Sequence, residues 1–301
     1  MNIRIATRKS KLALWQANFV KNALLKKYPD AKITLVEIIT EGDKQQTIPL
    51  THIGGKSLFV KALQTALINN TADIAVHSIK DMSVHNTDGL ILGAILKRED
   101  ARDAFVSATY ANLLSMPAHS IIGTSSPRRT ALIKSIRPDS NIKLLRGNVD
   151  TRLAKLDAGD YDAIVLAAAG LIRLGLAARI TDYFSTDIFT PAIGQGAIGV
   201  ECRENDVVIR DLLRFMHDAQ TALCVNAERS VNQILGGDCH AAVGAHAKIL
   251  GDQIDLSAVV GSTDGKIILR AHQAGDAKDS DALAKNIADD LLRQGAGKLV
   301  G

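Results

Sequence analysis

The fold is decided by the stretch Gly123-Thr124-Ser125-Ser126-Pro127-Arg128-Arg129, which joins a short apolar strand to a helix. The residues before it, Ile121–Gly123, have the β-branched character of a buried strand. Ser125 or Ser126 can cap the helix that follows, and Pro127 fits its first position. A strand that turns into a helix across a polar loop is typical of an α/β sheet, where ligands bind at such turns.

Three other polar loops follow strand-like runs in the same way. They are Ala6-Thr7-Arg8-Lys9-Ser10, His77-Ser78-Ile79-Lys80-Asp81 and Leu145-Arg146-Gly147-Asn148-Val149-Asp150-Thr151-Arg152. Each loop carries basic side chains and opens a helix-like run. Guanidinium groups gathered at the ligand-binding turns of a sheet indicate a ligand with several negative charges. The pattern favours an enzyme or receptor that handles a polyanion over a scaffold protein.

The first two thirds of the chain alternate strands with helices. Strands are expected at Ile3–Thr7, Lys32–Thr40, Asp73–His77, Ile91–Leu96, Ala104–Ser107, Ile121–Gly123, Lys143–Leu145, Ala163–Leu166 and Ile198–Glu201. Helices are expected after Ser10 and at Ser57–Asn69, Pro127–Ile136 and Val149–Leu156. This alternation predicts mostly parallel sheets.

The last third changes character. A helix is expected at Thr221–Leu235, followed by period-two stretches at Val243–Leu250, Gln253–Val260 and Lys266–His272. The turn signals between those stretches predict antiparallel hairpins. Ser280–Gln294 is expected to close the chain as an amphipathic helix, which gives a small α+β domain.

Composition excludes several classes of function. Of the 301 residues 47% are hydrophobic, 23% are charged and only 4% are aromatic, and the net charge is +4. This small basic excess and the scarcity of stacking side chains argue against a nucleic-acid partner. The longest apolar run, Ala163 to Ile172, is half the roughly 20 residues of a membrane helix, so no membrane partner is expected.

Cysteine usage and the N-terminus favour a cytoplasmic protein. The cysteines are Cys202, Cys224 and Cys239, an odd and sparse set that suits neither a disulfide framework nor a metal site. The chain also begins directly with a strand and shows no export signal. We therefore expect reduced thiols and no bound metal.

The arginines admit two interpretations. Arg128 and Arg129 lie in the first turn of a helix, where a cation opposes the helix dipole, and an anionic ligand there would relieve the conflict. Alternatively, both side chains point into solvent. Arg146 and Arg152 flank the helix start at Asn148, and the same two interpretations apply to them with equal weight.

For Asp81 and Cys239 the residues alone favour structural roles. Asp81 follows an apolar strand beside Lys80, so it could cap a helix or pair with the lysine. It could also act as an acid or base, or stabilise a cationic intermediate. Cys239, in Gly236-Gly237-Asp238-Cys239-His240, suits a small buried side chain, with a reactive thiol beside His240 as the alternative.

Taken in order, these segments resemble the porphobilinogen deaminase (hydroxymethylbilane synthase) family over nearly the whole chain. The motifs that carry the resemblance are Ala6-Thr7-Arg8-Lys9-Ser10, Leu12-Ala13-Leu14-Trp15-Gln16, Gly54-Gly55-Lys56, Asp73-Ile74-Ala75-Val76-His77-Ser78, Lys80-Asp81, Arg98-Glu99-Asp100, Arg102-Asp103-Ala104-Phe105, Gly123-Thr124-Ser125-Ser126, Arg128-Arg129, Arg146-Gly147-Asn148, Pro191-Ala192-Ile193-Gly194-Gln195-Gly196-Ala197 and Gly236-Gly237-Asp238-Cys239. Each motif is weak alone, but their order and spacing are specific.

The resemblance implies a fold and a covalent cofactor. It implies two doubly wound α/β domains like those of periplasmic binding proteins, at 1–97 with 197–216 and at 102–191, and a small α+β domain at 219–301. It also implies one dipyrromethane per chain, joined by a thioether to Cys239. A monomer with porphobilinogen as substrate is the family expectation. Four units would be deaminated and added head to tail, and hydrolysis would release hydroxymethylbilane.

The resemblance further implies site roles. Catalysis is assigned to Asp81, which would stabilise developing positive charge and move protons at the pyrrole nitrogens. Cofactor carboxylates are assigned to Ser78, Lys80, Thr124, Ser125, Ser126, Arg128, Arg129, Arg146 and Arg152. Substrate contacts are assigned to Arg8, Gln16, Lys56, Phe59 and Arg173, and the loop Gly42–Lys56 would form a lid.

Some positions depart from the family's common pattern, and a rival function stays open. The departures are His52, Ser57, Met82-Ser83 and Ala241-Ala242, none of which removes a proposed catalytic group. The rival is a two-domain protein that binds a small anion without catalysis, because a fold alone does not fix a function.

Overall fold

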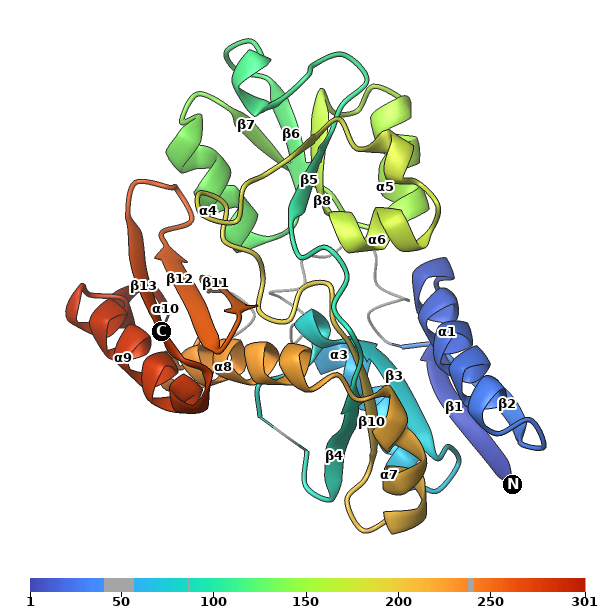
Figure 1. Cartoon of the computed structure of the whole chain (residues 1–301). Coiled ribbons are helices and arrows are strands. Elements are labelled where there is room, and N and C mark those ends of the chain that lie inside the picture. The colour runs from blue at the N-terminus through green and yellow to red at the C-terminus, as the bar shows by residue number, and fades with distance from the viewer. Residues whose placement is uncertain (41–56, 86, 238–240, 301) are drawn as a thin grey trace. The chain divides into compact units, whose positions relative to one another are not determined.

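A computed structural model describes residues 1–40, 57–85, 87–237 and 241–300, with the backbone alone at 57–59. The chain forms two compact units, one from Met1–Glu99 with Ala197–Ala222 and one from Asp100–Gly196 with Leu223–Gly301 (Figure 1). Each unit is built around a five-stranded sheet, and the second also holds a three-stranded sheet. The α/β fold class is confirmed, as is the small C-terminal α+β region. The boundaries expected for three domains stay a prediction.

The first unit has the strand order β2-β1-β3-β10-β4. Its strands are β1 (Asn2–Arg8), β2 (Lys32–Ile38), β3 (Ile74–Ser78), β4 (Leu90–Ile95) and β10 (Ile198–Arg203). β1 runs parallel to β2 and β3, whereas β10 runs antiparallel to β3 and β4. The helices are α1 (Lys11–Lys27), α3 (Ser57–Ile68) and α7 (Val207–Leu213), and the 3₁₀ turns are η2 (Ile79–Asp81) and η5 (Arg214–Met216).

Helices α1 and α3 each contact β1 and β3, the strands that carry the pocket described below. Ile5 and Ile74 are fully buried because these central strands are covered on both faces. Val20 and Leu24 of α1 belong to one apolar cluster of this core, and Leu63 of α3 belongs to another. The packed helices thereby fix the carboxyl ends of β1 and β3.

The larger sheet of the second unit has the strand order β7-β6-β8-β5-β9. Its strands are β5 (Asp103–Val106), β6 (Ile121–Thr124), β7 (Asn141–Leu144), β8 (Ala163–Ala167) and β9 (Asp182–Tyr183). The helices are α4 (Pro127–Ile136), α5 (Val149–Asp157) and α6 (Ala168–Arg173), and the 3₁₀ turns are η3 (Leu113–Ser115) and η4 (Ala177–Arg179). β6 is parallel to β7 and β8, whereas β5 is antiparallel to β8 and β9.

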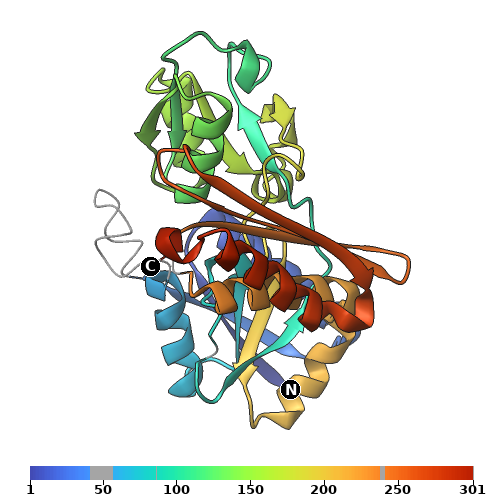
Figure 2. The ribbon, with the colours of Figure 1, turned by 90° about the vertical axis from the view of Figure 1, so that its left-hand side faces the viewer.

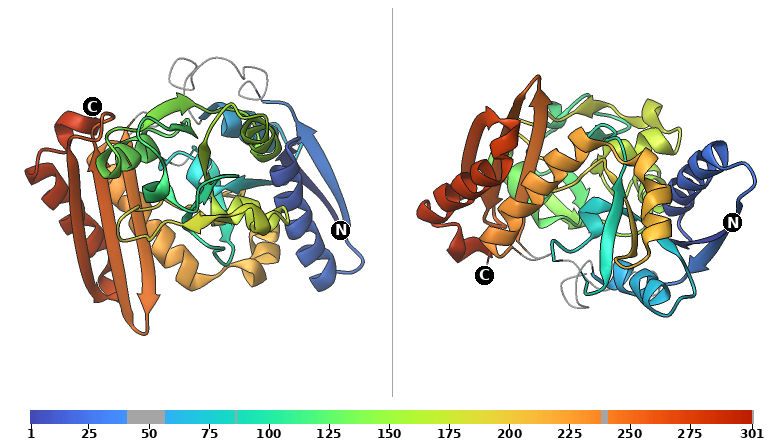
Figure 3. Two further views of the ribbon diagram at one scale, coloured as in Figure 1. Left: turned by 90° about the horizontal axis from the view of Figure 1, so that it is seen from above. Right: turned by 60° about the horizontal axis from the view of Figure 1, so that its bottom comes forward.

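The three-stranded sheet is antiparallel, as the period-two pattern predicts. It consists of β11 (Ala242–Leu250), β12 (Gln253–Gly261) and β13 (Ile268–Asp276). The other elements of this region are α8 (Ala219–Leu235), η6 (Ala277–Asp279), α9 (Ser280–Arg293) and α10 (Gly297–Val300). α9 lies along β12 and β13 on one face of the sheet (Figures 2 and 3). Val259 of β12 joins the core that contains Phe105 and Ile122, so the two sheets of this unit share apolar packing.

The expectation of mostly parallel sheets holds for four of the five strands in each large sheet. The exceptions are β10 and β5, which run antiparallel to their neighbours. The elements α6, α7, α10 and β9 were not expected. The apolar run from Ala163 hides the junction between β8 and α6, since strand and helix there have the same composition.

Candidate functional site

The predicted site residues lie on both units. Arg8, Gln16, Ser78, Lys80 and Asp81 belong to the first unit, and Thr124, Ser125, Ser126, Arg128, Arg129, Arg146, Arg152 and Arg173 belong to the second. Lys56, Cys239 and the loop 42–56 lie outside the described residues, as does the side chain of Phe59. Each unit is considered separately below.

A small pocket of about 70 Å³ lies on the first unit, where β1 and β3 end. Its polar lining residues are Arg8, Ser10, Gln16, His77, Ser78 and Asp81, and the apolar ones are Leu12, Ala13, Val60, Leu63 and Val76. It therefore combines a guanidinium and a carboxylate with a partly apolar wall. The structure brings four predicted residues together here: Arg8, Gln16, Ser78 and Asp81.

Local capping and strand ends place these side chains. The hydroxyl of Ser10 accepts a hydrogen bond from the backbone N–H of Ala13 at 3.3 Å and so starts α1. One turn further along α1, the buried amide of Gln16 donates from Nε2 to Ser78 Oγ at 2.8 Å. This bond ties α1 to the end of β3, directly before the turn that carries Asp81.

Asp81 does not cap an α-helix, so that interpretation is wrong. It is the last residue of η2, a single 3₁₀ turn whose N-cap residue is Ser78. Asp81 lines the pocket instead. Lys80 precedes it in the same turn and is partly exposed.

His77 and Glu201 form a buried pair beside this pocket. His77 Nε2 lies 3.1 Å from Glu201 Oε2, and both side chains are 4% exposed. Gln64 of α3 donates from Nε2 to the other carboxylate oxygen, Oε1, at 2.9 Å. The packed or hydrogen-bonded role expected for His77 is what the structure shows. Sequence reasoning missed Glu201, although a lone carboxylate inside the apolar strand Ile198–Cys202 was a usable signal.

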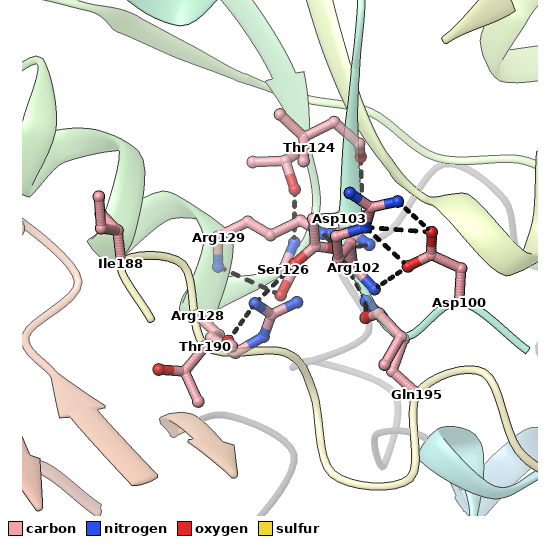
Figure 4. Close-up of polar contacts among 12 residues, drawn as sticks. Asp100, Arg102, Asp103, Thr124, Ser126, Arg128, Arg129, Ile188, Thr190 and Gln195 are labelled. Carbon is pink, nitrogen blue, oxygen red and sulfur yellow. Dashed lines mark hydrogen bonds and ion pairs between the residues drawn. The ribbon is translucent and has the colours of Figure 1, made fainter. Parts of the chain in front are cut away.

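On the second unit, Arg128 and Arg129 converge on Asp103 (Figure 4). Arg129 donates to Asp103 Oδ1 from Nε at 2.9 Å and from Nη2 at 2.6 Å, and from Nη1 to the carbonyl of Val165 at 2.8 Å. Arg128 Nη1 lies 2.8 Å from Asp103 Oδ2 and donates to the carbonyl of Thr190 at 2.7 Å. The solvent-exposed alternative for these arginines is wrong, because they are 3% and 6% exposed.

The electrostatics of this cluster follow from its burial. Desolvation alone would raise the pKa of Asp103, but the charges of Arg128 and Arg129 outweigh it and hold that pKa well below its usual range. Desolvation also lowers the pKa of Arg128, and the charge of Asp103 offsets part of this effect. Arg128 and Arg129 oppose the helix dipole at the start of α4, as expected. The carboxylate of Asp103 balances their charge.

The cluster reaches beyond α4. Gln195 donates from Nε2 to the carbonyl of Ala101 at 2.7 Å and to Asp103 Oδ1 at 3.1 Å. A Cβ atom added at Gly244 of β11 would lie 2.9 Å from Arg128 Cδ and 2.8 Å from the carbonyl of Pro191. Only glycine allows β11 to approach Arg128 this closely. The strand that follows the Cys239 segment therefore packs directly on the arginine cluster.

Two guanidinium atoms of this unit are buried without a hydrogen-bond partner among the described residues. They are Arg146 Nη1 and Arg128 Nε. Arg146 is 8% exposed, and burial lowers its pKa. A buried donor with no partner is costly, and a carboxylate ligand would satisfy it. The solvent-exposed interpretation of Arg146 is therefore wrong, and its role as an anion ligand stays a prediction.

The remaining predicted residues frame this region. Ser126 caps α4 by accepting from the backbone N–H of Arg129 at 3.4 Å, and Thr124 Oγ1 accepts from the N–H of Ser126 at 3.2 Å. Arg152 donates from Nε to the carbonyl of Gly147 at 2.7 Å. Arg173, the last residue of α6, donates from Nη2 to the carbonyl of Gly196 at 2.6 Å.

Two further findings bear on the kind of site. Across residues 1–40, 57–85, 87–237 and 241–300, no group of three or more His, Cys, Asp and Glu side chains is placed to hold a metal ion. Within the same ranges, every helix is too short or too polar to cross a membrane.

Comparison with known proteins covers nearly the whole chain. The family model described as porphobilinogen deaminase, dipyromethane cofactor binding domain, matches residues 3–211, and the one described as porphobilinogen deaminase, C-terminal domain, matches residues 222–293. The porphobilinogen deaminases of Coxiella burnetii strains Dugway 5J108-111 and RSA 493 / Nine Mile phase I are each 50% identical over 299 residues, which is 99% of this chain and 97% of the relative.

Two solved structures are similar at low sequence identity. One is a putative methionine-binding lipoprotein from Bacillus subtilis, 13% identical, which covers 73% of this chain and 92% of its own with a TM-score of 0.46. The other is a periplasmic substrate-binding protein of an ABC transporter from Coxiella burnetii, 13% identical, which covers 73% and 94% with a TM-score of 0.47.

Proposed function

The chain belongs to the porphobilinogen deaminase family, and from this premise we propose how its residues perform that activity. The enzyme deaminates porphobilinogen and joins four units head to tail on a dipyrromethane primer, from which hydroxymethylbilane is released for tetrapyrrole synthesis. The observation that carries the proposal is the buried guanidinium of Arg146, whose Nη1 has no hydrogen-bond partner among the described residues. The alternative of a small-anion-binding protein without catalysis is not supported by these matches.

The arginine cluster of the second unit fits the cofactor. Each pyrrole of a dipyrromethane carries an acetate and a propionate, and buried guanidinium donors suit such carboxylates. Arg128 and Arg146 hold these groups with the donors Nε and Nη1, which have no hydrogen-bond partner among the described residues. Thr124, Ser125, Ser126 and Arg152 assist at the helix starts. Ser78 and Lys80 are assigned to the cofactor on the family resemblance alone. When bound through Cys239, the dipyrromethane supplies the nucleophilic carbon on which the product grows.

Arg129 has a different part in this proposal. Three of its nitrogens already donate to Asp103 and to the carbonyl of Val165. It therefore orders the cluster by fixing the carboxylate that also faces Arg128. Any hydrogen bond from Arg129 to the cofactor uses a guanidinium hydrogen that these three bonds leave available.

The pocket of the first unit suits the reacting porphobilinogen. Arg8 binds a substrate carboxylate, and Gln16 with Ser78 orients the ring through their shared hydrogen bond. The Asp81 carboxylate stabilises positive charge that develops as ammonia leaves, and it moves the proton at the pyrrole nitrogen. Arg173, Lys56 and Phe59 are assigned to the incoming substrate, with 42–56 as the lid, on the family resemblance alone.

We also propose that the enzyme works as a monomer in the cytoplasm, without nucleic-acid or membrane partners. The sparse and odd set of three cysteines supports a reducing compartment.

Incubation with porphobilinogen tests the activity. We expect release of ammonia together with a linear tetrapyrrole, with four molecules of ammonia for each molecule of tetrapyrrole. Tight binding of porphobilinogen with no ammonia released would contradict the proposal and favour the small-anion-binding alternative.

A further inference from the structure

Glu201 is a buried carboxylate that the reaction as proposed does not use. It lies in β10 between Val200 and Cys202, and it is 3% exposed. Both of its oxygens are engaged, Oε2 by His77 and Oε1 by Gln64. Within the described part of the chain, His77 is the basic side chain that lies within hydrogen-bonding distance of it.

The strand register explains why the two side chains meet. β10 runs antiparallel to β3, with His77 opposite Gly199 and Ala75 opposite Glu201. Residues two apart on a strand point to the same face, so His77 and Glu201 are diagonal neighbours across the pair of strands. Gln64 completes the contact from α3, which packs on both strands.

A buried polar pair of this kind contributes little to stability by itself. Well-packed apolar side chains of similar volume stabilise a core equally well or better. What distinguishes this pair is that His77 also lines the pocket that contains Asp81. A carboxylate accepts hydrogen bonds but cannot donate them, so an ionised Glu201 requires a hydrogen on His77 Nε2.

We propose that Glu201 is a positioning residue that acts through His77. It fixes the orientation of the imidazole and the ring nitrogen that carries the hydrogen, and it thereby shapes the wall of the Asp81 pocket. The inference rests on the proposed function, since it assigns the pocket to the reacting pyrrole. Gln64 holds the carboxylate from its other side.

The Glu201→Gln variant tests this proposal with almost no change of volume. A glutamine can turn its amide NH₂ toward His77, which would remove the hydrogen from Nε2 and move it to Nδ1. We expect kcat to fall about tenfold or more while KM changes less than about twofold. Glu204→Gln makes the same replacement at a nearby exposed glutamate. It is the matched control and should leave both kcat and KM unchanged.

A spectroscopic readout does not depend on turnover. In protein labelled with ¹⁵N in its histidine rings, the His77 signals are assigned by their loss in His77→Gln. We expect Glu201→Gln to exchange the protonated and unprotonated nitrogen shifts of His77, and Glu204→Gln to leave them in place. The double variant Glu201→Gln/His77→Gln should be no slower than His77→Gln alone, because Glu201 acts through that ring.

Three outcomes are distinguishable. Unchanged His77 shifts and unchanged kcat in a folded Glu201→Gln protein overturn the inference. A loss of thermal stability with kcat unchanged overturns it too, because that pattern shows a structural role. If the wild-type protein releases no ammonia from porphobilinogen, the proposed function fails instead, and the His77 shifts still report whether the pair sets the tautomer.

Discussion

Arg129 donates two hydrogen bonds to a single carboxylate oxygen of Asp103, Oδ1, from Nε at 2.9 Å and from Nη2 at 2.6 Å. The same carboxylate lies 2.8 Å from Arg128 Nη1 and is completely buried. The Asp103 carboxylate therefore forms ion pairs with two of the arginines that are assigned to the carboxylates of the cofactor. Among the described residues, Arg128 Nε has no hydrogen-bond partner.

Removing the Asp103 carboxylate should reduce the stability of the fold. In Asp103→Asn, two buried guanidinium groups lose their counter-charge, so we expect the free energy of unfolding to fall by about 3–5 kcal/mol. Chemical denaturation with a two-state fit measures the loss. Asp157→Asn removes the partner of Arg179 in a more exposed pair and should change stability by less than about 1 kcal/mol. Equal effects of the two variants would refute the role given to Asp103.

The same carboxylate makes stability depend on pH. The folded pKa of Asp103 lies well below its unfolded value, because Arg128 and Arg129 outweigh the penalty of burial. A depressed folded pKa contributes stability that is fully present above the unfolded pKa, near pH 4, and is lost as pH falls toward the folded pKa. We expect the wild-type protein to lose stability below about pH 4 more steeply than Asp103→Asn. Parallel pH profiles of the unfolding midpoint would exclude this source.

Asp81→Asn should separate catalysis from assembly. Asparagine keeps the size of the side chain but cannot take up a proton or balance a positive charge, so we expect kcat to fall by about 10²–10⁴-fold. The cofactor should still load, because its proposed ligands lie mainly on the second unit. Single-turnover ammonia release and intact mass report the two properties on one sample. Full turnover in this variant would remove Asp81 from the mechanism.

Arg146→Met should have opposite effects on the apo-protein and the loaded protein. Without cofactor, the buried Nη1 lacks a partner among the described residues, so an apolar replacement should leave the apo-protein as stable or more stable. With cofactor, the same change should remove the stabilisation that loading gives the wild type. Melting curves of both forms measure this, with exposed Arg214→Met as the control. A large loss of apo-protein stability would show that Arg146 has a structural role instead.

The local structure of the site can be predicted well from the sequence. The partners of its side chains and strands across long sequence distances cannot. The bounds expected for α4 are those observed, because Ser126 and Pro127 are strong start signals for a helix. The partner of Arg129 could not be read in the same way, since Asp103 lies 26 residues away on another strand. The antiparallel entry of β10 was also hidden, because an apolar strand has the same composition in either direction.

Attachment of the cofactor to Cys239 is the central claim about this enzyme. Intact mass of the denatured protein, with peptide mapping around Cys239, tests it. We expect a mass excess equal to two deaminated porphobilinogen units, located on the Cys239 peptide and absent from Cys239→Ala. An excess on another peptide, or a Cys239→Ala protein that is loaded and active, would contradict the account.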